Sequence, residues 1–222
     1  MSGVVHSRPM KTRIVLVMAL CVTVSASAAE IGVIGKKFII VDKVTTAGKA
    51  KIVYVSKDQT AGITKGTDTD PNGIDVTFEF GYDGADGRIF VTAGGLDPGD
   101  TEGWKTNKPT VAKFVNKQAP AGSTVAKVAV IKPGKLLKIV AKGLGDPPGA
   151  PIDIFAQGAP SGDVHTSFLV DNGTDENAHC STFSNCTYKL IAADTGAKLV
   201  CRTSTADPTC AVLGSPSGAF LE

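Results

Sequence analysis

Hydrophobic and polar residues follow a strand-like pattern along most of this chain. At Ile74–Tyr82 every second residue is apolar, which is typical of a half-buried β-strand. Two further apolar runs, Val128–Ile131 and Leu136–Ala141, meet at a Lys-Pro-Gly-Lys turn. Two such runs joined by a tight turn predict a β-hairpin. The segment Val125–Gly145 is therefore predicted to form a hairpin at the centre of an all-β domain.

The same reasoning predicts a series of short strands. They are expected at residues 36–43, 50–57, 88–92, 111–116, 152–156, 164–170, 187–192 and 198–203. Residues 93–108, which hold the only tryptophan, and the cysteine-rich segment between 170 and 187 are expected to be loops. Roughly ten short strands separated by turn residues predict an antiparallel β-sandwich of immunoglobulin-like general architecture. A β-barrel is the alternative.

Residues 29–212 are predicted to form one domain, followed by a disordered tail at 213–222. The segment Gly35–Lys43 matches Gly134–Lys142 at five of nine positions, and Gly196–Val200 is a weaker third copy. Duplication of a half-sandwich would explain this similarity and would give pseudo-repeated halves at 31–116 and 125–212. Chance similarity between lysine-rich strands that follow a glycine is the simpler explanation, and both interpretations stay open.

The first 28 residues have the features of an export signal. Lys11 and Arg13 form a positive region after Met10, which is an alternative start of the chain. Residues 14–24 are apolar, and Ala26–Ala28 offers a small-residue cleavage pattern. The apolar stretch is too short to span a membrane, and we expect no membrane span later in the chain. The mature protein is expected to be secreted, periplasmic or located at the cell surface.

Four cysteines remain after removal of the signal, and all lie in the last quarter of the chain. They are Cys180, Cys186, Cys201 and Cys210. An even number of cysteines in an exported chain predicts two disulfides that staple the C-terminal part. Three connectivities exist, and the pairing of sequence neighbours, 180 with 186 and 201 with 210, is the simplest. Zinc binding by these thiols and His179 is disfavoured because the C-x5-C and C-x8-C spacings are not those of zinc sites.

Charge is segregated along the chain. Cleavage of the signal removes three basic residues and leaves 20 basic against 21 acidic residues. The net charge of successive blocks is +4 for 30–65, −8 for 66–102, +9 for 103–145 and −6 for 146–222. One interpretation is that neighbouring strands of opposite charge pair in a sheet. The other is a dipolar molecule whose positive face binds an anionic polymer or a second copy of the chain.

The predicted hairpin lies in the block that contains no acidic residue, so its lysines are the candidate basic binding face. These residues are Lys127, Lys132, Lys135, Lys138 and Lys142. Nucleic acid is disfavoured as a partner, because the mature chain has two arginines and few aromatic residues among its lysines. A solvated face without a partner is the simpler interpretation. An anionic polymer, or self-association through segregated charge, is the candidate partner, and the sequence leaves the choice open.

The sharpest motif precedes the alternating strand at 74–82. It matches the D-x-[DN]-x-[DN]-G-x5-E pattern of EF-hand calcium loops, with candidate ligands Asp68, Asp70, Asn72 and Glu79. Against this, the flanks are predicted strand and loop rather than helices, Pro71 stiffens the turn, and Asp75 replaces a usual aliphatic residue. An acidic turn before a strand is the simpler interpretation. Calcium is the only cofactor that the sequence raises.

Constellations for catalysis are sparse. The mature chain has two histidines, His165 and His179, and it lacks the G-x-S-x-G elbow, a P-loop and a dinucleotide fingerprint. Acid pairs such as Asp83 and Asp86 have the residue types of a glycosidase, but aspartates are common in loops. We therefore expect a non-catalytic protein with a binding or structural role. The alternative is a secreted carbohydrate-active enzyme or a calcium-dependent carbohydrate-binding module.

Three segments carry a resemblance to other proteins: VAKVAVIKPGKLLKIVAKGLGD, the earlier TVAKFVNK and the later GAKLVCR. With them, the chain resembles an uncharacterised group of exported bacterial proteins, and the resemblance covers most of the mature chain. It implies bacterial export. It implies no activity, ligand or functional residue, so the function has to be inferred from the residues of this chain.

Overall fold

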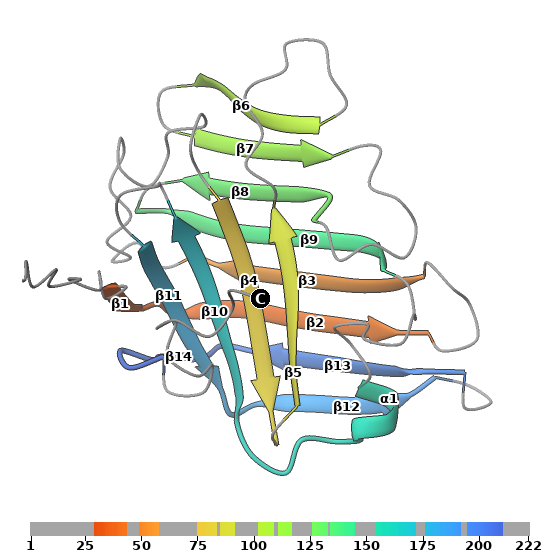
Figure 1. The fold of residues 1–222 in the computed structure, drawn as a ribbon. Coiled ribbons are helices and arrows are strands. Elements are labelled where there is room, and N and C mark those ends of the chain that lie inside the picture. The colour runs from red at the N-terminus through yellow and green to blue at the C-terminus, as the bar shows by residue number, and fades with distance from the viewer. Residues whose placement is uncertain are drawn as a thin grey trace, which may run out of the picture.

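A computed structural model describes eleven segments of the chain. They are residues 29–43, 49–57, 75–83, 85–91, 102–108, 111–116, 126–132, 134–144, 154–171, 176–191 and 195–210. The predicted signal at 1–28 and the predicted tail at 213–222 lie outside these residues. Within them, 14 strands form two sheets that pack face to face, and one short helix lies outside the sheets. The strands of one sheet cross those of the other at a steep angle (Figure 1). The predicted β-sandwich is confirmed, and the described strands form two sheets rather than a closed barrel.

The larger sheet contains the predicted hairpin. Its strands are β2 (Gly35–Asp42), β3 (Ala50–Ser56), β6 (Glu102–Lys108), β7 (Val111–Asn116), β8 (Val128–Lys132), β9 (Leu136–Leu144), β12 (Cys186–Leu190) and β13 (Ala197–Arg202). They run antiparallel in the spatial order β12-β13-β2-β3-β9-β8-β7-β6. The hairpin is formed by β8 and β9, and Gly134 in its turn has a φ of 64°, which glycine adopts without strain.

The smaller sheet covers one face of the larger one. Its strands are β1 (Ala29–Gly32), β4 (Asp75–Tyr82), β5 (Ala85–Val91), β10 (Val164–Asp171), β11 (Glu176–Phe183) and β14 (Thr205–Ala206). Their order is β1-β11-β10-β4-β5, with β14 paired to β11, and β1 runs parallel to β11. The segments that resemble one another in sequence form β2, β9 and β13, all in the larger sheet.

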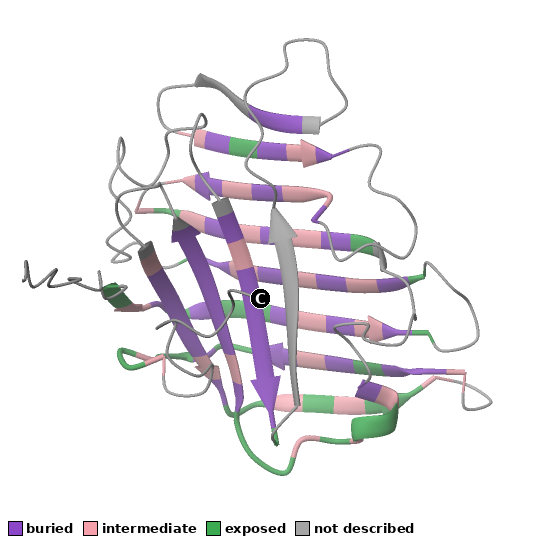
Figure 2. Cartoon of the chain, viewed as in Figure 1, coloured by how far each residue is buried: buried purple, intermediate pink, exposed green. Residues whose placement is uncertain are grey.

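Aromatic side chains fill the space between the two sheets. Phe38 of β2 and Tyr54 of β3 contact Phe78 of β4, with ring centroids 5.7 and 4.9 Å apart. The Tyr54 hydroxyl lies 2.9 Å from the Ser181 hydroxyl of β11, so this polar group in the core has a partner. Buried and more exposed residues alternate along the strands of the larger sheet (Figure 2). One face of that sheet therefore packs on the core, and the other faces solvent.

Three local predictions are wrong. Residues 102–108 form β6 and residues 176–183 form β11, where loops were expected. Neither strand shows the apolar alternation by which a strand is recognised. The buried positions of β11 include the polar residues His179 and Ser181, and β6 has a single large apolar residue, Trp104. The third error is the strand expected at 152–156. Ile154–Gln157 instead form one helical turn, α1, where the buried Asp42 carboxylate accepts a hydrogen bond from the Phe155 N–H.

Candidate functional site

The outer face of the larger sheet gathers basic residues. In β3, Ile52 and Tyr54 are fully buried against the smaller sheet. The intervening Val53, with Lys51 and Val55, therefore faces outward, because side chains alternate along a strand. The same alternation identifies the outward residues of β12, β13, β2, β9, β8 and β7. We call the outer surface of these seven strands the cationic face.

A row of aliphatic side chains crosses the middle of the cationic face. Strand register places its members side by side on six neighbouring strands, in the order Val200, Ile39, Val53, Val140, Val128 and Val115. All six are half-buried. Five are valines, so the row is a flat band of short, β-branched side chains. We call it the aliphatic row.

Basic residues form a row on each side of the aliphatic row. The first lysine row runs Lys189, Lys198, Val41, Lys51 and Lys142. The second lysine row runs Arg202, Lys37, Val55, Lys138, Val130 and Lys113. Each lies two residues from the aliphatic row along the strands, so the two lysine rows are about 13 Å apart. In the described parts of these seven strands, no acidic residue occupies an outward position.

Three pairs of basic residues lie directly opposite one another on neighbouring strands of this face. They are Lys189 with Lys198, Lys37 with Arg202, and Lys51 with Lys142. Like charges placed directly opposite in a sheet destabilise it, by roughly 0.2–1 kcal/mol a pair on the scale of other cross-strand pairs. The interpretation that strands of opposite charge pair is therefore wrong for this sheet, since its lysine-bearing strands pair with one another.

The lysines predicted from the hairpin are only part of this surface. Lys138 and Lys142 belong to the two lysine rows, and Lys132 faces outward opposite Leu136. Lys127 is half-buried just before β8, and Lys135 is exposed in the turn. The sequence interpretation missed the basic residues on β12, β13, β2, β3 and β7. Their outward direction was readable from alternation, but their position beside the hairpin depends on the order of strands in the sheet.

A hollow of about 300 Å³ lies at one end of the cationic face, over β12 and β13. It is lined by Thr187, Lys189, Lys198, Val200 and Arg202. Thr187 lies directly opposite Val200, and Lys189 lies directly opposite Lys198. Lys198 and Arg202 are two residues from Val200 in opposite directions along β13. Thr187 and Val200 therefore lie between basic residues on both sides.

Two disulfides are present in the C-terminal part, as predicted, but the predicted pairing is wrong. The bonds join Cys180 to Cys210 and Cys186 to Cys201. Cys180 and Cys186 lie in different sheets, whereas Cys186 is directly opposite Cys201, with their Cα atoms 4.0 Å apart. This bond joins the two strands that carry the hollow. Disulfides persist in oxidising compartments, so both bonds fit an extracellular or periplasmic protein.

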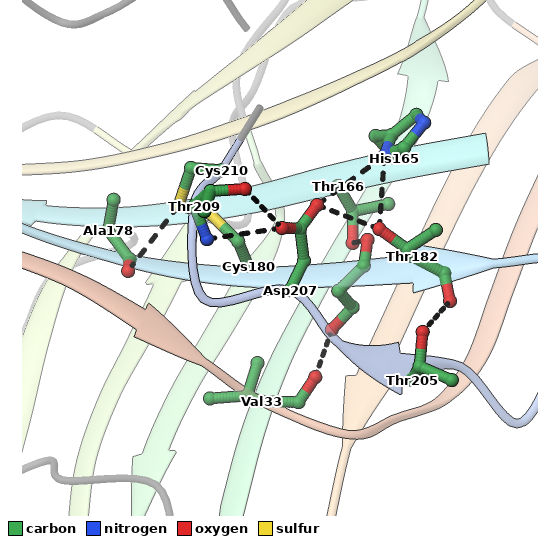
Figure 3. A network of polar contacts seen from close by, with 11 residues as sticks. Val33, His165, Thr166, Ala178, Cys180, Thr182, Thr205, Asp207, Thr209 and Cys210 are labelled. Atoms are coloured by element: carbon green, nitrogen blue, oxygen red, sulfur yellow. Dashed lines mark hydrogen bonds and ion pairs between the residues drawn. A yellow bond between two sulfur atoms is a disulfide. The ribbon is translucent and has the colours of Figure 1, made fainter. Parts of the chain in front are cut away.

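A second polar cluster lies on the outer side of the smaller sheet, where residues 203–210 cross β11 (Figure 3). The Thr182 hydroxyl donates to the Asp207 carboxylate at 2.8 Å, and His165 Nδ1 lies 3.0 Å from Thr182 Oγ1 and 3.5 Å from Asp207. A hydrolytic relay needs the imidazole between hydroxyl and carboxylate, with one nitrogen for each. Here one nitrogen faces both groups, so the cluster ties the C-terminal segment down rather than activating Thr182.

The other residues considered for catalysis lie elsewhere. His179 is fully buried in β11, neither ring nitrogen has a hydrogen-bond partner among the described residues, and burial lowers its pKa to about 4. Asp83 is exposed after β4, where hydrogen bonds from the Ser161 N–H and hydroxyl lower its pKa. Asp86 lies in β5 opposite Gly81. His179 is therefore enclosed in the core, while Asp83 is engaged by the segment that follows α1.

The calcium motif falls largely outside the described residues. Asp68, Asp70 and Asn72 are not among them, and Glu79 is buried in β4, opposite Ser167 and Arg88 in the strand register. Among the described side chains, no group of three or more His, Cys, Asp or Glu is placed to hold a metal. Calcium binding by this motif stays a prediction from the sequence.

Comparisons with known proteins found no family model, no curated protein and no solved structure that matches the chain. In the part of the chain that the structure describes, no helix is long and apolar enough to cross a membrane.

Proposed function

We propose that this chain is an exported, non-catalytic binding protein that holds an anionic polymer on its cationic face. The observation that carries the proposal is the set of three like-charge pairs on a face whose described strands place no acidic residue outward. Each pair opposes folding. An anion placed over the lysine rows offsets that repulsion, so the bound state is the one in which this face is most stable.

The extent of the face supports a polymer rather than a compact ligand. The aliphatic row spans six strands, which corresponds to about 25 Å at the usual strand spacing. A polymer lying across the strands contacts both lysine rows through its anionic groups and the aliphatic row through its apolar atoms. The row consists of short side chains and lacks the protruding Trp, Phe or Leu with which surface-bound proteins insert into a membrane.

Export is part of the proposal. The predicted signal at 1–28 and the two disulfides support it, and the resemblance to exported bacterial proteins supports a bacterial cell surface or extracellular space as the place of action. Polymers that carry phosphate, sulfate or carboxylate groups have the charge that complements this face.

The proposal is tested by titrating the mature protein with fluorescent polyphosphate, dextran sulfate and polygalacturonate and following anisotropy. The double variant Lys51→Gln/Lys142→Gln removes one like-charge pair from the centre of the face. If each lysine contributes as a cation near an anionic surface does, binding weakens about fivefold per lysine. The affinity also becomes less sensitive to added NaCl, because fewer counterions are displaced.

A matched control changes the net charge equally at another place. Ala159 and Ala206 are exposed on segments that adjoin the smaller sheet, and Ala159→Glu/Ala206→Glu gives the same change of two charges. This control keeps wild-type affinity if the cationic face is the site. Equal weakening in both variants, or no binding of any polymer, overturns the proposal. Light scattering that shows salt-sensitive oligomers without polymer binding would identify the face as a subunit interface instead.

A further inference from the structure

The hollow over β12 and β13 differs from the rest of the cationic face in its density of positive charge. Three of its five lining residues are basic, namely Lys189, Lys198 and Arg202. In the middle of the face, by contrast, Val41 separates Lys198 from Lys51, Val55 separates Lys37 from Lys138, and Val130 separates Lys138 from Lys113. The hollow also contains the hydroxyl of Thr187. Its residues therefore combine a fork of guanidinium donors, two ammonium groups and a neutral donor.

This set of donors fits a phosphoryl group better than a carboxylate. A guanidinium alone uses both oxygens of a carboxylate in a bidentate pair. A phosphomonoester has three terminal oxygens and a charge close to −2 at neutral pH, so it has acceptors left for Lys189, Lys198 and Thr187. The volume of about 300 Å³ is at the lower end of small-ligand sites and suits such a group with part of its carbon skeleton.

The hollow is held in shape by covalent and hydrogen bonds at its end. Cys186 and Cys201 form a disulfide directly beside the Thr187–Val200 pair. The Arg202 N–H donates to the Asn185 carbonyl at 3.1 Å, which extends the pairing beyond the disulfide. β12 is an edge strand in the described sheet, so these bonds fix positions that an edge strand otherwise leaves mobile. A fixed backbone beneath the donors lowers the ordering cost of binding.

We infer that this hollow is a subsite for a phosphomonoester group of the anionic polymer, with Arg202, Lys189, Lys198 and Thr187 as its donors. The inference rests on the proposed function. Val200 belongs to both the hollow and the aliphatic row, and its neighbour in that row is Ile39 of β2. A polymer that places a phosphoryl group in the hollow can therefore continue along the aliphatic row.

The test uses inorganic phosphate as the probe, followed by amide NMR shifts of the mature protein at pH 7.5 and constant ionic strength. We expect saturable shifts at Thr187, Lys198 and Val200, with acetate giving none. Lys198→Gln and Arg202→Gln weaken phosphate binding at least tenfold. Arg202→Lys keeps the charge but loses the fork, and it gives an intermediate loss.

Lys138→Gln is the matched control, because Lys138 has the same chemistry on the same face but lies outside the hollow. It changes phosphate affinity less than twofold if the hollow is the site. Shifts that spread over the whole face without saturation overturn the inference. So does a loss in Lys138→Gln equal to that in Arg202→Gln.

The polymer titrations separate this inference from the proposed function. If a polymer binds through Lys51 and Lys142 while phosphate leaves the hollow unshifted, the subsite is overturned and the proposed function stands. If phosphate saturates the hollow but no polymer binds, the subsite is supported as an anion site and the proposed function is overturned.

Discussion

Two titratable residues on opposite sides of the smaller sheet show how position sets charge. His179 faces the core, since Ser181 two residues along β11 contacts Tyr54 of the other sheet, and burial keeps its imidazole neutral at pH 7. Asp207 lies on the outer side. Partial burial would raise the pKa of Asp207, but hydrogen bonds from Thr182, Thr209 and His165 outweigh it and lower that pKa. Both residues therefore link stability to pH, but over different ranges.

The variant His179→Leu is expected to remove a pH dependence of stability. The pKa of His179 is lowered from 6.5 to about 4 on folding, so between these values the unfolded chain binds a proton that the folded protein excludes. Stability contributed by the neutral imidazole is complete above pH 6.5 and is lost as the pH falls, by about 1.4 kcal/mol per unit. Urea unfolding at pH 6.5 and pH 5 should show a loss of about 2 kcal/mol in the wild type and little in His179→Leu.

Asp207→Asn is the control for this experiment. A carboxylate whose pKa is lowered on folding contributes stability that is present above its ordinary value of 3.8 and is lost as the pH falls through the lower folded value. This variant is therefore less stable than the wild type at both pH 6.5 and pH 5, and its slope between them is unchanged. A His179→Leu variant that keeps the wild-type slope would contradict the assignment.

At the scale of elements, β12 depends strongly on its disulfide. None of its residues is fully buried, and it lies at the edge of the described sheet, so packing contributes little to holding it. The Cys186–Cys201 bond closes a separation of 15 residues, for which chain entropy gives about 3 kcal/mol of stabilisation. The Cys180–Cys210 bond spans 30 residues and gives about 3.5 kcal/mol in the same treatment.

The two disulfides are expected to protect different elements. Cys186→Ala/Cys201→Ala should lower the free energy of unfolding by about 3 kcal/mol and speed amide exchange in β12. Cys180→Ala/Cys210→Ala should have a similar global effect but speed exchange in residues 203–210, which β14 and Asp207 attach to β11. Urea unfolding and hydrogen exchange of both variants measure this. Loss of protection in the same strands in both variants would contradict it.

The sequence predicts elements where local pattern and burial agree. β2, β3, β4 and the β8–β9 hairpin show apolar residues at the buried positions, so their existence is readable from alternation. β11 was missed because Ala178, His179 and Ser181 do not look like core residues, although all three are buried. The hydrogen bond of Ser181 to Tyr54 and the covalent bond of Cys180 replace aliphatic packing there.

The site was less predictable than the strands, because it depends on which strands are neighbours in the sheet. Lys51 and Lys142 are 91 residues apart in the chain and become direct neighbours when β3 pairs with β9. The sequence around either lysine does not indicate that these two strands pair. For the same reason the disulfides could not be paired from spacing: Cys186 meets Cys201 only because β12 and β13 are adjacent and in that register.

For the whole molecule, charge is divided between the two layers. The strands of the larger sheet contain 12 basic and two acidic residues, and those of the smaller sheet contain one basic and six acidic residues. A chain whose net charge is only +2 therefore has a strong charge asymmetry across its thickness. Such a distribution attracts an extended anion to one side and turns the other side away from it.

This asymmetry predicts that NaCl stabilises the protein. The like-charge pairs repel across about 5 Å, whereas opposite charges on the outer faces of the two sheets are separated by the thickness of the sandwich, so their attraction is weaker. Screening therefore relieves more repulsion than it removes attraction. The cationic face has three such pairs, and the register of β6 and β7 adds a fourth, Lys105 with Lys113. The free energy of unfolding should therefore rise by about 1 kcal/mol between 10 and 300 mM NaCl.

Urea unfolding at several NaCl concentrations measures this rise, and two variants locate its origin. Lys51→Gln/Lys142→Gln removes one of the four pairs and should reduce the rise by about a quarter, while Ala159→Glu/Ala206→Glu should keep it. A stability that is flat or falls with NaCl would mean that the face is not under electrostatic strain. In that case the like-charge pairs would no longer support a bound anion. They support it only because a bound anion relieves their repulsion and so stabilises the sheet.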